Sequence, residues 1–477
     1  MPSIDTELIA PLSRISEILL KRPGRVSVDG IKRLANIYGF ETFTDTLAVN
    51  DQNDLVFAYP ESRSTTPVGK EVPQIERLSL SGKILLIDID FQDGAVKNVG
   101  LSSAINIESI DARSYDFVDG FGSFPKVGTI LYENLQSTTL DKFNKNLRLL
   151  GQLDRLSASA PFDLFNTFNL LTYNLLKACA AEKEHIADNS ADILTEKELA
   201  ADYDVGVRGV GKVLVNQSDK IGLFLKFWQD NRFLAELDRS ERPEYMLHFK
   251  IMESPRADPV ETKETKRVVE WFNGQWSPDV PLDLLVLELC PPVWIPEDLL
   301  LELGLNEYEV VTPDNSVFNS TTDTLDDFYQ EINKNYSYTF GTEDQIIESF
   351  FLTGCKFVKI YKLKLAELDK LRALVSGLRS WCLVNNVVRN LLQGQQKTAG
   401  SSQTDELWLN DMVRGNLEKL DNSSGASSEV IRLSVETLEP QQIDLTIRGV
   451  LLKIIDGQVK SSDKKLAKLV TKTEELF

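Results

Sequence analysis

RLSLSGKILLIDIDFQDGAVKNV, residues 77–99, is the stretch that decides the fold class of this chain. Apolar residues recur at every second position from Leu85 to Phe91, which is the period of a half-buried β-strand, whereas Asp88 and Asp90 lie on the opposite face. Asp93-Gly94 is typical of a tight hairpin turn, and a return strand begins at residues 96–99. The stretch therefore predicts a β-hairpin.

Helical periodicity surrounds this hairpin. Before it, residues 12–19 and 31–38 carry apolar side chains at helical spacing and predict short helices, and we interpret the polar residues 50–76 as a loop or insert. After it, residues 140–156 and 163–184 predict two long amphipathic helices, which we expect to pack on each other and on the hairpin. The N-terminal part is therefore expected to be helical, with one β-hairpin.

The middle of the chain is predicted to be a second β-rich region. The expected strands are residues 211–216, 221–229, 245–253 and 282–290, with a helix over 265–272 as a further candidate element. Pro291-Pro292 is expected to close the last of these strands, because proline cannot donate to a sheet ladder.

A third region is predicted to contain a strand, a long helix and further strands. Residues 356–365 read as a strand, residues 367–392 as the helix, and two β-like runs cover 431–436 and 443–455. The overall fold class is α+β. We divide the chain into residues 1–190, 200–310 and 336–477, with flexible Ser/Gly-rich linkers at 394–405 and 421–429.

Composition and charge exclude several classes of function. The 477 residues include 72 Asp and Glu against 52 Lys and Arg, a formal net charge of −20. Direct binding to nucleic acid or to anionic lipid needs a basic surface, so we expect neither. The four cysteines are far apart with no CxxC pair, which disfavours a zinc ribbon and a disulfide framework. The acidic N-terminus and the lack of a long apolar run predict no signal peptide and no membrane span.

Two motifs suggest phosphate chemistry. The apolar strand ending in Asp88 and Asp90 is similar to the strand that haloacid-dehalogenase-type phosphatases use, where the first Asp is a nucleophile and the second an acid or base. In those enzymes Thr or Val stands two residues after the second Asp, but this chain has Gln92 there, and a hairpin turn follows. We therefore favour the polar, solvent-facing end of a hairpin strand.

The segment Gly206–Lys212, GVRGVGK, has the skeleton of a phosphate-binding loop. Val213 stands where Ser or Thr should hold Mg²⁺, so a glycine-rich turn into a strand is the better interpretation. The two histidines are His185, in a polar helix tail, and His248, inside a β run, and their spacing predicts no catalytic or metal-binding arrangement. We expect no catalytic, cofactor-binding or metal-binding residues.

Four stretches carry a family resemblance through their order and spacing. They are Arg22-Pro23-Gly24 with residues 31–34 and 38–43, the strand 83–91, the helix 143–150 with Leu153-Asp154 and residues 162–165, and the turn 294–298. Together they resemble the fungal form of subunit 1 of the Mediator complex, which links transcription activators to RNA polymerase II. The resemblance spans about residues 22–300, with a weaker match over 356–392.

This resemblance implies a nuclear, non-catalytic subunit of the middle module of Mediator. It also implies contacts with neighbours such as subunits 4, 7 and 9, and an indirect link to RNA polymerase II. Animal members bind nuclear receptors through LxxLL helices, but here Val388 occupies the first position of the nearest match, so that activity is not carried over. The long helix 367–392 could pack as core or meet a partner helix.

Two other classes of function stay open. One is a phosphate-handling enzyme that uses Asp88 and Asp90 or the Gly206–Lys212 loop. The other is an unrelated cytoplasmic scaffold.

Overall fold

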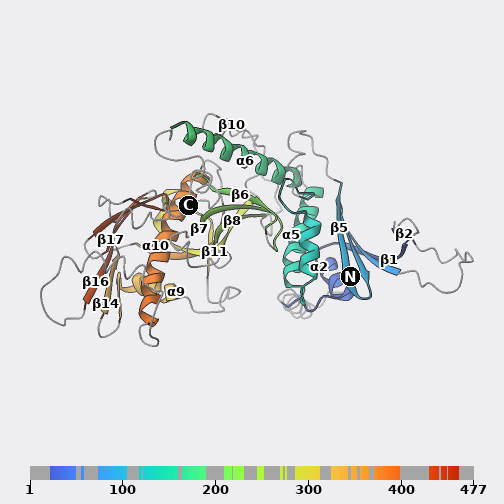
Figure 1. The fold of residues 1–477 in the computed structure, drawn as a ribbon, viewed down its shortest axis with the longest axis horizontal. Helices are drawn as coiled ribbons and strands as arrows, with labels where there is room; N and C mark the ends of the chain where they lie inside the picture. Colours follow the sequence, from blue (N-terminus) through green and yellow to red (C-terminus); the bar gives the residue numbers. More distant parts are fainter. Residues whose placement is uncertain are drawn as a thin grey trace, which may run out of the picture.

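The computed structural model describes most of the predicted elements. The described residues are 22–49, 55–57, 74–104, 118–120, 122–159, 164–189, 209–217, 219–229, 244–251, 269–271, 274–276, 285–311, 324–341, 345–351, 355–364, 370–397, 429–439, 442–447 and 450–460. Figure 1 shows the three larger sheets along the long axis of the molecule, with helices between them. The α+β class is confirmed. None of the described helices is long and apolar enough to cross a membrane.

The predicted hairpin is part of an antiparallel sheet, which we call the N-terminal sheet. Its strands are β1 (Glu41–Val49), β2 (Leu55–Phe57), β3 (Gln74–Ser81), β4 (Leu85–Gln92) and β5 (Ala95–Ser103), in the order β2-β1-β3-β4-β5. The turn between β4 and β5 is the predicted one: Asp93 and Gly94 both have positive φ, 53° and 75°. Two adjacent residues with positive φ match the right-handed twist of the flanking strands.

Four helices follow or flank this sheet. They are α2 (Val28–Ile37), α4 (Val127–Leu135), α5 (Asp141–Ser159) and α6 (Leu164–Asn189). Helices α2 and α4 contact the sheet, and α5 contacts α2, α4 and α6. The predicted apolar stripes of α5 and α6 are buried in the core. Helices α2 and α4 therefore cover one face of the N-terminal sheet, as the apolar face of β4 requires, whereas α6 extends from α5 to β6 of the central region.

The expectation of a helical N-terminal part is wrong. Helix α2 forms as predicted, and Gly39 follows it with φ of 90°, but residues 41–49 are strand β1. The sequence ETFTDTLAV has threonine at alternate positions, which favours a strand without a run of large apolar residues. Residues 55–57 and 74–76, predicted as loop, are also in strands, and the predicted helix 12–19 lies outside the described residues.

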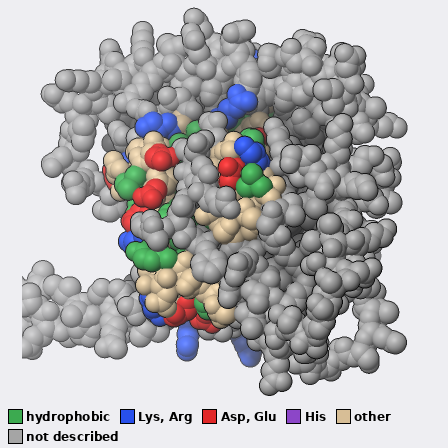
Figure 2. Space-filling model, turned by 90° about the vertical axis from the view of Figure 1, so that its left-hand side faces the viewer, with side chains coloured by type: hydrophobic (Ala, Val, Ile, Leu, Met, Phe, Trp, Pro, Cys, Tyr) green, Lys and Arg blue, Asp and Glu red, His purple; other side chains and the backbone are tan. Residues whose placement is uncertain are grey.

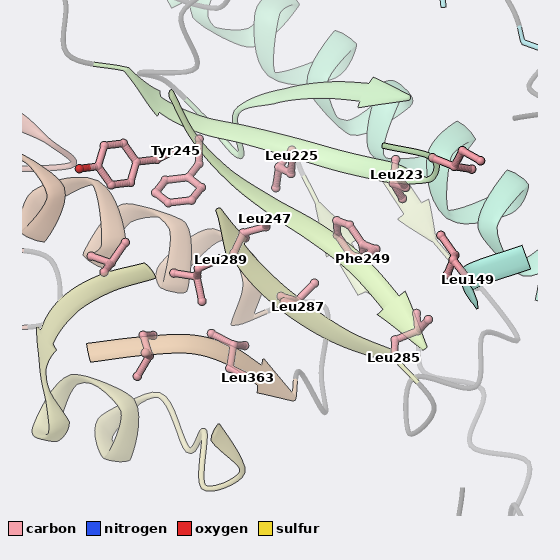
Figure 3. Close-up of a cluster of buried hydrophobic side chains, with 14 of the residues drawn as sticks. Leu149, Leu223, Leu225, Tyr245, Leu247, Phe249, Leu285, Leu287, Leu289 and Leu363 are labelled. Carbon is pink, nitrogen blue, oxygen red and sulfur yellow. The ribbon is translucent and has the colours of Figure 1, made fainter. Parts of the chain in front are cut away.

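The central sheet is built from all four predicted strands of the middle region and two others. Strands β6 (Lys212–Val215), β7 (Leu223–Gln229), β8 (Glu244–Ile251), β11 (Leu285–Pro296), β12 (Tyr308–Val310) and β15 (Phe357–Lys364) lie in the order β12-β15-β11-β8-β7-β6. Every pairing in it is antiparallel. One face buries the apolar cluster of Figure 3, in which Leu225, Leu247 and Leu289 lie side by side on neighbouring strands.

Two expectations for the middle region are wrong. Pro291-Pro292 does not close the last strand: β11 runs on to Pro296, and α8 (Glu297–Glu302) begins there. The strand register shifts between Glu288 and Val293, so the prolines sit in a bulge where no ladder donor is needed. The helix considered over 265–272 is replaced, where described, by β9 (Val269–Trp271), which pairs with β10 (Gly274–Trp276).

The C-terminal sheet packs around the long predicted helix. Its strands are β13 (Ser337–Gly341), β14 (Gln345–Phe351), β16 (Glu429–Glu439), β17 (Gln442–Ile447), β18 (Val450–Ile455) and β19 (Gln458–Lys460), preceded by α9 (Thr324–Asn335). Only β14 and β16 pair in parallel among the described strands. The predicted run 443–455 is in fact a hairpin of β17 and β18. Figure 2 views this end, where the described acidic, basic and apolar side chains are mixed.

Helix α10 (Leu371–Lys397) confirms the predicted long helix and lies between the central and C-terminal sheets. It extends through residues 394–397, which were predicted to begin a flexible linker. The rest of that linker, and the one at 421–428, lie outside the described residues. The division into three regions stays a prediction, although β15 of the third region pairs with β11 of the second.

Candidate functional site

The Asp88 and Asp90 carboxylates accept hydrogen bonds from side chains on the neighbouring strand β3. Ser79 Oγ donates to Asp88 Oδ1 at 2.6 Å. Arg77 donates to both oxygens of Asp90, from Nε at 2.7 Å and from Nη2 at 3.0 Å. Asp90 is only 2 % exposed, so the interpretation of a solvent-facing end is wrong for this residue. The hydrogen bond to Asp90 raises the pKa of Arg77, and this bidentate pair is typical of a structural contact between strands.

The Gly206–Lys212 segment serves as a packed turn, where it is described. The carbonyl of Gly209 accepts a hydrogen bond from Arg379 Nη1 at 2.7 Å. Gly211 has φ of 105°, and a Cβ there would lie 2.3 Å from the carbonyl oxygen of Lys226. Only glycine fits so close to another backbone. Lys212 then begins β6, so a strand follows the loop, not the helix that a phosphate-binding loop needs.

His248 is a buried structural residue. Its ring stacks on Phe224 with centroids 4.1 Å apart, and its Nε2 lies 3.1 Å from the carbonyl oxygen of Ile221. Burial lowers the pKa of His248 well below its usual value. His185 lies on α6, but its side chain is outside the description. Among the described residues there is no cluster of three or more His, Cys, Asp or Glu that could hold a metal ion.

The stripe on α10 is core. Leu374, Leu378, Val384 and most of their neighbours between Leu371 and Val388 are buried. The polar interruption is also used inside the protein, because Asn385 donates to the carbonyl of Trp294 at 2.9 Å and accepts from the Tyr329 hydroxyl at 2.5 Å. A partner helix therefore has no access to this stripe, and the core interpretation is confirmed.

Arg379 forms a joint that the sequence did not predict. This arginine of α10 is completely buried and donates from Nε to the carbonyl of Phe227 at 2.6 Å. From Nη1 it donates to Gly209 and, at 2.9 Å, to Asp456 in the turn between β18 and β19. The backbone N–H of Gly457 in the same turn donates to Ser380 Oγ at 3.1 Å. One guanidinium thus connects the central sheet, α10 and the C-terminal sheet.

Asn146 forms a second joint, between the N-terminal helices and the central sheet. This buried residue of α5 donates from Nδ2 to the carbonyl of Asp219 and to Asn134 Oδ1, each at 2.6 Å. Its Oδ1 accepts from the backbone N–H of Ile221 at 3.0 Å. Asp219 and Ile221 lie between β6 and β7, and Asp219 also pairs with Lys142 at 3.3 Å. The Asn-rich surface of α5 gave no sequence signal for this contact.

Asp154 forms a third joint, within the N-terminal region. Its carboxylate accepts from the backbone N–H groups of Lys83, Ile84 and Leu85 at 2.8 to 2.9 Å. These residues form the turn between β3 and β4, so α5 holds that turn in place. The contacts around all three joints are structural: polar side chains satisfy backbone groups, and none of the three presents a free nucleophile or acid.

The amino-acid sequence is similar to one protein family. Residues 13–271 match the family model described as Mediator of RNA polymerase II transcription subunit 1. The protein of that name from Eremothecium gossypii is 25 % identical over 304 residues, which cover 61 % of this chain and 55 % of that protein. The one from Schizosaccharomyces pombe is 23 % identical over 237 residues, 48 % of this chain and 42 % of that protein.

The chain spans about half the length of the curated relatives it matches. The match to the family model covers more than half of the chain and includes the whole N-terminal sheet, its helices and the first strands of the central sheet. The chain therefore belongs to the family of Mediator of RNA polymerase II transcription subunit 1.

Proposed function

We propose that this chain is a non-catalytic subunit of the Mediator coactivator complex, acting in the nucleus. The family match over residues 13–271 carries the proposal. In this role the chain relays regulator input to RNA polymerase II through protein–protein contacts. The proposal assigns it no catalytic residue, cofactor or metal.

The geometry of the polar groups supports a role that depends on surfaces. Asp88, Asp90 and the described part of the Gly206–Lys212 loop are used in contacts within the fold. A formal charge of −20 fits a subunit that reaches chromatin through other proteins, because phosphate binding needs basic side chains.

The finer assignment follows from the resemblance. We place the chain in the middle module of Mediator, in contact with neighbours such as subunits 4, 7 and 9, and with RNA polymerase II only indirectly. The three regions 1–190, 200–310 and 336–477 are the units that we expect to contact different neighbours.

Co-purification tests the proposal. The tagged full chain, expressed in a fungal host and isolated from nuclear extract at moderate salt, is expected to carry other Mediator subunits with it. Crosslinking and mass spectrometry would then identify which subunits it touches. A chain that folds and enters the nucleus but elutes alone would overturn the proposal, and retention in the cytoplasm would favour an unrelated scaffold.

A further inference from the structure

The N-terminal sheet has one covered face and one open face. Helices cover the face that carries Leu78, Ile87 and Ile89. The strand register puts Phe43, Ser79, Asp88 and Gly100 on the other side, which we call the outer face: Phe43 lies opposite Ser79, Ser79 opposite Asp88, and Asp88 opposite Gly100. A Cβ built on Gly100 meets nothing within 4 Å, so the outer face is open there.

Two large apolar side chains stand on this outer face. Phe43 of β1 is 52 % exposed and Leu86 of β4 is 38 % exposed. Strand β3 lies between their strands and the register offsets them by two residues, so the two are about 10 Å apart across the sheet and about 7 Å along it. The floor between them consists of the small residues Ser79 and Ser81. This width is close to that of one α-helix.

The outer face is also acidic. Glu41 and Asp45 are exposed on β1 beside Phe43, and the Asp88 side chain is 27 % exposed beside Leu86. Arg77 lies between Asp45 and Asp90 in the register, and it pairs with both Asp90, in a bidentate contact, and Asp88, at 3.9 Å. The basic residues Lys83 and Lys97 lie in the turn and the bulge at opposite ends of β4. The strands of this face thus present apolar anchors flanked by the exposed acidic side chains of Glu41 and Asp45.

We propose that the outer face docks a lysine- or arginine-bearing amphipathic helix of another protein. Its apolar side chains would cover Phe43 and Leu86, and its basic side chains would face Glu41 and Asp45. The sheet already packs helices on its opposite face, so a helix on the outer face would complete a three-layer arrangement. The proposal rests on the proposed function for the source of the helix, a neighbouring subunit of the complex.

The first test uses a synthetic amphipathic helical peptide with leucine on one face and lysine on the flanks. Fluorescence anisotropy with the full chain should show binding that weakens as salt is raised. The variant Phe43→Ser/Leu86→Ser and the variant Glu41→Lys/Asp45→Lys should each bind at least roughly tenfold more weakly, as expected for loss of a central anchor or its complementary charge. A peptide with glutamate in place of lysine should not bind.

A matched control distinguishes binding at the outer face from non-specific peptide binding. Leu301 and Glu302 are an exposed apolar–acidic pair on α8, far from the outer face, and Leu301 is 56 % exposed. Leu301→Ser/Glu302→Lys should leave peptide binding unchanged. All the substituted side chains are exposed, so circular dichroism and the melting temperature should match those of the wild type. Equal binding by the wild type and both outer-face variants would overturn the proposal.

The second test separates this proposal from the proposed function. Wild-type chain that co-purifies with Mediator subunits, while both outer-face variants lose at least one of them, supports the docking face. Co-purification of the same subunits with the wild type and the outer-face variants would overturn the docking face and leave the proposed function standing. Wild-type chain that binds the lysine peptide but isolates alone supports the docking face and counts against the proposed function.

Discussion

Arg379→Met tests whether one buried guanidinium holds three parts of the fold together. The Arg379 side chain is 0 % exposed and donates to the carbonyls of Phe227 and Gly209 and to the Asp456 carboxylate. Methionine has a similar length and an apolar side chain, so it removes all three hydrogen bonds and keeps much of the packing of α10.

The size of the effect comes mainly from the two carbonyls. Phe227 lies where the register between β7 and β8 shifts, between Lys226 and Trp228, so its carbonyl has no regular partner in the ladder. An acceptor left unsatisfied when buried costs about 1–3 kcal/mol. The ion pair contributes less, because Asp456 is 40 % exposed and such pairs are worth about 0–1 kcal/mol. Removing the guanidinium also removes the cost of burying its charge, which offsets part of the loss. We therefore expect Arg379→Met to lower the free energy of unfolding by about 3 kcal/mol.

Urea unfolding of the full chain, followed by circular dichroism, measures this loss as a lower midpoint. Asp456→Asn is the matched control, and it should lower the free energy of unfolding by less than about 1 kcal/mol. Arg379→Lys should fall between the two, since an ammonium cannot reproduce the planar fork. Equal losses for Arg379→Met and Asp456→Asn would refute the reasoning, because the ion pair would then dominate. A wild-type midpoint for Arg379→Met would refute it as well.

Three further predictions concern other buried groups. Asp154→Ala should lower the free energy of unfolding by about 3 kcal/mol in the same urea assay, because three backbone donors lose their acceptor, and Asp154→Asn should recover part of that loss. Burial lowers the pKa of His248, so the unfolded chain takes up a proton that the folded chain excludes. Below a pH of about 6.5 the free energy of unfolding should then fall by up to about 1.4 kcal/mol per pH unit, and His248→Gln should flatten this dependence in pH-dependent unfolding. Burial raises the pKa of Cys382 well above its usual value, and Cys290 is partly exposed, so mass spectrometry after alkylation of the native chain should find Cys290 modified before Cys382.

The elements that could be predicted from sequence carry a strong local period. Helices α5, α6 and α10 have long apolar stripes, and the hairpin turn at Asp93-Gly94 is defined by two residues that tolerate positive φ. The local sequence does not predict strand β1, because the burial of its residues depends on pairing with distant strands. Of its side chains only Leu47 is strongly buried among those described, and the pairing with β3 that stabilises it spans more than 20 residues of sequence. A strand of this kind has no local apolar signal.

The local structure expected at the two phosphate-like motifs forms, with a hairpin turn after Asp90 and a strand after the Gly206–Lys212 loop, but the contacts of these residues depend on distant parts of the chain. Val213 lies in strand β6, as a glycine-rich turn into a strand predicts. Nothing near that segment indicates that Arg379, 170 residues later, needs the carbonyl of Gly209. The alternating pattern likewise predicts that Asp88 and Asp90 lie on the exposed face of the strand. Asp90 is buried there because Arg77 on the neighbouring strand pairs with it.

The joints at Asn146 and Arg379 explain how an acidic chain with three sheets can hold its parts in fixed positions. Each joint places a polar side chain of a helix against backbone groups in a turn, bulge or loop of a neighbouring sheet: Asn146 at Asp219 and Ile221, and Arg379 at Gly209 and Phe227. Such contacts have directional geometry, so they fix orientation in a way that apolar packing alone does not. Because the polar groups at the joints are consumed inside the fold, the chain can offer partners only its outward surfaces. Of these, the outer face of the N-terminal sheet combines exposed apolar side chains with acidic ones, a combination that suits a contact surface with an apolar centre and a polar rim.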